Sequence, residues 1–144
     1  MKRFWIALLI VICIVGVYAV TTYDVIYHND VFRGESESWK GEYRINGWWL
    51  FTEKGNRIEF DGRVDGVLTL TYLKEVEKPP ELDHFEIHYD LGSGGGSKIE
   101  DDVVMKQVYR FKRFSTGVPN KDAVLTAVIN MDGDIQTVEL VRIK

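Results

Sequence analysis

Residues Phe4 to Tyr23 form a run of twenty residues without a charged side chain, and this run most constrains what the chain can become. Twenty helical residues rise about 30 Å, roughly the hydrocarbon thickness of a bilayer. A soluble domain seldom buries such a run, because helices on its surface need a polar face. Lys2 and Arg3 precede the run, which predicts a cytoplasmic N-terminus and an exported remainder. We therefore expect a lipid bilayer to be the partner of residues 4–23.

This segment allows two interpretations, and in both of them the rest of the chain is exported. It can remain as a single-pass anchor in the cell membrane with the C-terminal domain outside, or it can be a signal peptide. Cleavage after Ala19 would then give a secreted protein, and residues 17–19 suit a signal peptidase. The apolar run continues through Val20, however, and this favours the retained anchor. Lipidation is not expected, because Ile12 precedes Cys13 where a lipoprotein signal needs a small residue.

The rest of the chain has the length of one domain. We expect residues 1–23 as the anchor or signal segment, 24–30 as a linker and 31–144 as an extracytoplasmic domain. The domain must fold without a disulfide or a thiolate metal site, because Cys13 is the only cysteine. All 22 acidic side chains and 16 of the 18 basic ones follow residue 23, which gives this part a net charge of −6. Nucleic acid is therefore not an expected partner.

Alternation of large and polar residues dominates the exported part. Between Trp39 and Ile45, every second position carries a large apolar residue or glycine, which is typical of a half-buried strand. Asn46-Gly47 predicts a hairpin turn directly after it, and Asp132-Gly133 predicts another near the C-terminus. Residues 92–98, with the sequence GSGGGSK, predict a flexible loop.

The predicted fold class is all-β. Seven to nine short strands with turn signals between them favour an antiparallel β-sandwich, immunoglobulin-like, preceded by one N-terminal transmembrane or signal helix. A small barrel is the alternative.

Trp48 and Trp49 are the first candidates for a binding surface. Neighbours on a strand face opposite sides, so only one of the two indoles can enter a given core face. The other is covered by a loop or a strand edge, or it meets a sugar or a protein. Arg110 and Lys112 share a strand face and could contact an anionic polymer or lipid headgroups, or could simply keep that face solvated. Gly34 to Ser36 is a weaker candidate.

Metal binding and catalysis have weaker support. His84, Glu86 and His88 share one face of a predicted strand, but the two histidines would lie about 13 Å apart. Zinc–nitrogen bonds of about 2 Å cannot join both to one ion, so we expect no metal and no cofactor. The sequence contains no Gly-x-Ser-x-Gly elbow, and among 22 acidic residues some carboxylate pair fits a glycosidase by chance. We therefore expect no catalytic residue.

Four segments occur in the order of a known family: FRGESESWKGEY, LTLTYLKE, EIHYDLGSGGGS and VINMDGDIQTVEL. In these segments the chain resembles a family of small cell-envelope proteins, often lipoproteins, of Gram-positive bacteria. The matching positions are Gly34, Glu35, Ser36, Trp39, Tyr43, Asp132, Gly133, Glu139 and Leu140. The N-terminus departs from the pattern, because an uncharged segment stands in place of a lipobox. The resemblance implies export and a β domain, and it implies no activity or cofactor.

Three functions follow from these features. The first is a membrane-anchored extracytoplasmic domain that binds an envelope protein or glycan, through Trp48, Trp49, Arg110 and Lys112, without chemistry of its own. The second is an envelope hydrolase that uses paired carboxylates, which would need a cleft where two of them converge. The third is an accessory subunit of a membrane complex, which would need a wide exposed apolar patch.

Overall fold

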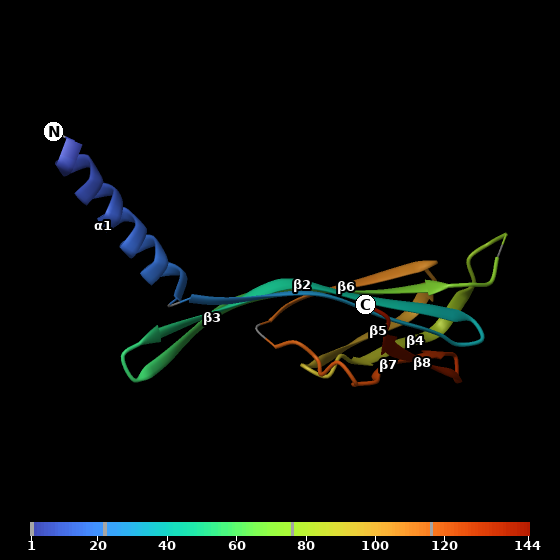
Figure 1. The fold of residues 1–144 in the computed structure, drawn as a ribbon. Coiled ribbons are helices and arrows are strands. Elements are labelled where there is room, and N and C mark those ends of the chain that lie inside the picture. The colour runs from blue at the N-terminus through green and yellow to red at the C-terminus, as the bar shows by residue number, and fades with distance from the viewer. Residues whose placement is uncertain (1, 22, 76, 116) are drawn as a thin grey trace. The chain divides into compact units, whose positions relative to one another are not determined.

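The computed structural model describes residues 2–21, 23–75, 77–115 and 117–144, and in the helix it describes side chains only from Trp5 to Val15. One helix, α1 (Lys2–Thr21), precedes eight strands (Figure 1). The strands are β1 (Tyr23–Glu35), β2 (Trp39–Lys54), β3 (Arg57–Tyr72), β4 (Glu81–Asp90), β5 (Gly95–Val104), β6 (Val108–Ser115), β7 (Leu125–Met131) and β8 (Asp134–Arg142).

The strands form one curled sheet in the order β5-β4-β7-β8-β1-β2-β3-β6. The printed registers of β1 with β8, β3 with β6, β4 with β5 and β7, and β7 with β8 are all antiparallel. The prediction of an all-β, antiparallel domain is therefore confirmed. The predicted sandwich of two separate sheets is not confirmed, because the strands connect into a single sheet.

The chain divides into two compact units. Unit 1 comprises Met1–Tyr27 and Trp48–Gly62, and unit 2 comprises His28–Gly47 and Arg63–Lys144. In the described part of the chain, no helix combines the length and the apolar character that a membrane crossing requires. The predicted membrane span at residues 4–23 is therefore not confirmed, and the side chain of Ala19 lies outside the described residues. Residues 24–30, predicted as a linker, belong to β1.

An aromatic core fills unit 2. Trp39 is fully buried, and its ring centroid lies 5.2 Å from that of Tyr72, 6.3 Å from Phe85 and 6.0 Å from Tyr109. Its indole nitrogen has no hydrogen-bond partner among the described residues, so Trp39 stabilises the core through packing. Phe85 of β4 stacks on Tyr109 of β6 at 4.8 Å. Because these strands lie near opposite ends of the sheet order, the curl of the sheet brings its two ends together over one core.

The predicted turn at Asn46-Gly47 is wrong. The strand β2 continues through both residues and ends at Lys54. The turn that follows lies at Gly55-Asn56, where the sequence also predicts one, and Gly55 has φ of 62°. An ideal Cβ on Gly47 would lie 2.3 Å from the carbonyl oxygen of Arg63. Glycine at this position thus permits close approach of two backbones within unit 2. The turn predicted at Asp132-Gly133 is confirmed.

The loop predicted at residues 92–98 is mostly ordered by pairing. Gly95 to Lys98 belong to β5 and pair with β4, which leaves a short connection between the two strands. Arg113 of β6 holds this connection, because its Nη1 donates to the carbonyl oxygen of Gly94 at 2.9 Å and to Ser93 Oγ at 3.2 Å. Gly92 and Gly94, which both have positive φ, therefore allow a tight turn that Arg113 holds against β6.

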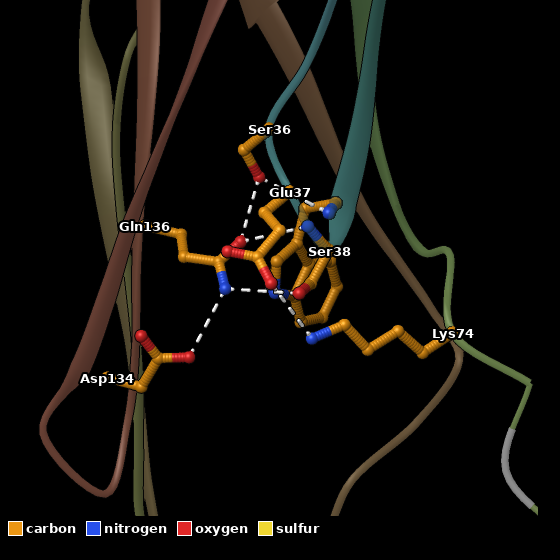
Figure 2. A network of polar contacts seen from close by, with 7 residues as sticks. Ser36, Glu37, Ser38, Lys74, Asp134 and Gln136 are labelled. Atoms are coloured by element: carbon orange, nitrogen blue, oxygen red, sulfur yellow. Dashed lines mark hydrogen bonds and ion pairs between the residues drawn. The ribbon is translucent and has the colours of Figure 1, made fainter.

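Gly34 and Glu35 are the last residues of β1, and Ser36 begins the connection from β1 to β2 (Figure 2). Gln136 of β8 reaches into this connection, and its Oε1 accepts hydrogen bonds from Ser36 Oγ and from the backbone nitrogen of Ser38, each at 3.0 Å. Its Nε2 donates to Ser38 Oγ at 3.1 Å. An ideal Cβ on Gly34 would lie 1.8 Å from the carbonyl oxygen of Glu139. The segment Gly34 to Ser36, the weaker binding candidate, therefore has a structural role in packing against β8.

Replacing Gln136 by Ala should destabilise the domain by about 1–3 kcal/mol, because the fully buried Ser38 would lose the partners of its hydroxyl and backbone nitrogen. Urea unfolding of the full chain, followed by Trp fluorescence, measures the change. Gln107, whose side chain is exposed, gives the matched control, and Gln107→Ala should leave the midpoint unchanged. Equal midpoints for both variants would show that the Gln136 amide contributes no stability.

Candidate functional site

The strand order leaves two open edges in unit 2. The strands β5 and β6 end the sheet, so within the described residues each has one edge without a neighbouring strand. Both edges start at one corner, because only residues 105–107 separate Val104 from Val108. The corner is fixed by two hydrogen bonds. The buried Met105 donates its N–H to the carbonyl of Pro80 at 2.9 Å, and the N–H of Lys106 donates to Tyr109 Oη at 3.0 Å.

The register of β3 with β6 determines which backbone groups point to the open edge. The N–H of Tyr72 donates to the carbonyl of Gln107 at 2.9 Å, so these two residues form a hydrogen-bonded pair of the antiparallel ladder. Hydrogen-bonded and non-hydrogen-bonded pairs alternate along an antiparallel ladder. The next hydrogen-bonded residues of β6 are therefore Tyr109, opposite Leu70, and Phe111, opposite Leu68. The residues between them direct their N–H and C=O groups away from β3. The open edge of β6 is thus lined by backbone groups of Val108, Arg110 and Lys112.

A hollow of about 320 Å³ lies at this edge. Its lining residues are Lys98, Lys106, Val108, Tyr109, Arg110 and Phe111. Tyr109 is anchored in the aromatic core, and the ring of Phe111 lies 4.9 Å from that of Tyr89 on β4. Burial raises the pKa of the Tyr109 hydroxyl above its ordinary value, so this group stays neutral. The floor of the hollow is therefore rigid and aromatic.

The charge around the hollow is positive. Lys98 pairs with Glu100 at 3.0 Å, but no ion pair found in the described residues includes Lys106, Arg110 or Lys112. The lining contains no carboxylate. Three cations at one strand edge attract an anionic group, even though the whole chain is acidic.

Two of the four residues predicted from the sequence belong to this edge. Arg110 lines the hollow, and Lys112 follows it on the same exposed face of β6 without lining the hollow. Sequence reasoning missed Lys98 and Lys106. The position of Lys98 depends on strand pairing, and that of Lys106 depends on the β5–β6 corner. The only local signal was Lys106 itself, three positions before the YRFKRF segment.

Trp48 and Trp49 belong to unit 1 and so to a different part of the molecule from Arg110. Trp49 packs within the β2–β3 hairpin, with its ring 6.4 Å from Phe51 and 6.0 Å from Phe60. Trp48 is 36% exposed. The structure thus gives Trp49 a packing role inside the hairpin and leaves Trp48 on the surface, as the alternation of neighbouring side chains predicts.

Each histidine on this face of β4 forms a hydrogen bond with a carboxylate. His84 Nδ1 lies 2.7 Å from Asp101 Oδ1, and His88 Nε2 lies 2.6 Å from Glu86 Oε1. In the described part of the chain, no three His, Cys, Asp or Glu side chains are grouped as metal ligands. The hydrogen bond that His84 donates to Asp101 raises the pKa of His84 above its ordinary value, with the charges of Asp101 and Glu86 adding to the effect.

Replacing Asp101 by Asn should lower the pKa of His84, because the imidazolium loses its main hydrogen-bonding partner. A raised folded-state pKa means that the pair stabilises the fold below the unfolded-state pKa and that this contribution is lost as pH rises through the folded value. NMR titration of the His84 ring protons measures the shift. Asp102→Asn is the matched control, because Asp102 already has φ of 50°, which Asn tolerates. An unchanged His84 titration in Asp101→Asn would refute the pairing.

No family model, curated protein or solved structure matches this chain, so the resemblance to envelope proteins stays a prediction.

Proposed function

We propose that this chain is a binding domain of the cell envelope, without catalysis of its own, and that it recognises an anionic segment of a partner protein. The observation that carries the proposal is the basic hollow at the open edge of β6, where Lys106 and Arg110 have no acidic partner among the described residues. A rigid aromatic floor surrounded by cations favours binding of a shaped anionic ligand.

An extracytoplasmic location is part of the proposal. It rests on the uncharged run at residues 4–23, with Lys2 and Arg3 before it, and on the resemblance to Gram-positive envelope proteins. The described part of α1 supports an apolar setting, because side chains from Trp5 to Val15 are exposed to solvent all around the helix. Such a helix is stable when lipid or another protein covers it. Residues 1–23 would then retain the domain at the membrane or direct its export.

We also propose to class the curled sheet with β-sandwiches. The packing of Phe85 on Tyr109 supports this, because it joins the face of β4 to the face of β6. An immunoglobulin-like strand arrangement is the finer form of this proposal.

A role as an accessory subunit of a membrane complex is the second candidate. The exposed apolar side chains of unit 1 favour it, since Ile58 and Phe60 of the β2–β3 hairpin are exposed in addition to the described part of α1. Monomeric soluble proteins seldom expose many large apolar side chains in one region. The hydrolase alternative gains no support from the hollow, which has no carboxylate in its lining.

The full-length chain in detergent should bind a fluorescent peptide of alternating Glu and Val, and it should not bind the corresponding Lys-Val peptide. The double variant Lys106→Gln/Arg110→Gln should weaken the acidic complex about tenfold, the equivalent of about 1.4 kcal/mol, because two charge pairs are lost. Fluorescence anisotropy at low salt gives the dissociation constants. Added salt should weaken binding through screening.

Arg57→Gln is the matched control, because it removes one positive charge from unit 1 and should leave the dissociation constant unchanged. Absence of binding to the acidic peptide would refute the proposed function. Equal binding to both peptides would refute the role of charge. Binding of neutral cell-wall glycan in place of the acidic peptide would make a glycan the partner.

A further inference from the structure

We propose that the partner binds by adding an extended acidic segment to the open edge of β6 as a further strand of the sheet. This inference rests on the proposed function and specifies the conformation of the ligand and the backbone groups that hold it. Strand addition combines main-chain hydrogen bonds, which give affinity, with alternating side-chain contacts, which give specificity.

The backbone of β6 is suited to this pairing. Because Tyr72 and Gln107 form a hydrogen-bonded pair of the β3–β6 ladder, the N–H and C=O groups of Val108, Arg110 and Lys112 point to the open edge. These residues repeat about every 6.6 Å along the strand, which is the spacing at which a paired strand offers its own groups. The hollow at the same edge provides space for the backbone of an added segment.

The side chains of β6 specify what that segment carries. Arg110 and Lys112 lie on the exposed face, whereas Tyr109 and Phe111 lie on the face turned to the core. Side chains of paired strands contact each other on the same face. A fitting ligand therefore alternates acidic residues, opposite Arg110 and Lys112, with apolar residues, over Tyr109 and Phe111.

The same charges disfavour a second copy of this chain as the occupant. Pairing of two β6 edges would place Arg110 and Lys112 opposite the same residues of the other copy, and like charges across a strand pair are destabilising. Basic side chains on an open edge are a common protection against such self-pairing. Charge complementarity thus selects an acidic strand from a different protein.

Backbone methylation of the peptide tests the inference. Two Glu-Val peptides are compared with the parent, one N-methylated at every Glu and one N-methylated at every Val. In an added strand only one of these two sets of N–H groups faces β6, so one peptide should lose at least about tenfold in affinity and the other should bind nearly as the parent does. Which of the two methylations, at Glu or at Val, weakens binding also shows whether the segment runs parallel or antiparallel to β6.

A variant of the protein gives the second measurement. Val108→Pro removes an outward N–H at the first residue of β6, where proline is tolerated and no hydrogen bond to β3 is lost. It should weaken binding of the parent peptide several-fold relative to Val108→Ala, with unfolding midpoints showing that both variants fold.

The outcomes separate the two proposals. If the parent peptide does not bind, the proposed function fails. If it binds but both methylated peptides bind alike, and Val108→Pro matches Val108→Ala, then the anionic site stands and strand addition is refuted.

Discussion

The stacking of Phe85 on Tyr109 is the contact on which the rest of unit 2 depends. It joins strands near the two ends of the sheet, and the buried ring of Trp39 packs against both. Each aromatic pair contributes about 0.5–1.5 kcal/mol beyond the burial of its area. Without these contacts an eight-stranded sheet would have one uncovered apolar face. The curl of the sheet is therefore the means by which the chain, lacking disulfides in its β part, covers its own core.

The curl also explains why β6 keeps an open edge. It brings β5 and β6 toward each other at the corner formed by residues 105–107, yet the strand order does not close between them. An open edge is a liability, because its unpaired backbone groups can recruit another chain. Basic side chains such as Arg110 and Lys112 disfavour pairing with a second copy of the edge, and in the proposed function the same charges attract an acidic partner. Under this proposal, one arrangement of residues serves both solubility and recognition.

Local sequence predicted much of this fold and little of its site. The alternating residues from Trp39 to Ile45 correctly predicted a strand, because a half-buried strand has apolar residues at every second position. The turn predicted at Asn46-Gly47 is wrong, because the glycine is needed there for the close approach of the Arg63 backbone. No local sequence pattern reveals that contact. Arg110 was found from its place in an alternating basic strand. Lys98 was missed, because only the pairing of β5 with β4 brings it to the hollow.

The sequence by itself determined the all-β class, the antiparallel strands and the turn at Asp132-Gly133, because each depends on period or on turn chemistry within a few residues. The tertiary structure decided that the strands form one curled sheet, that Gln136 fastens the connection before Trp39, and that β6 has an open edge. These features depend on residues about a hundred positions apart along the chain, such as Ser36 and Gln136. Such residues come into contact only when the whole core packs, and no single stretch of the sequence determines that packing.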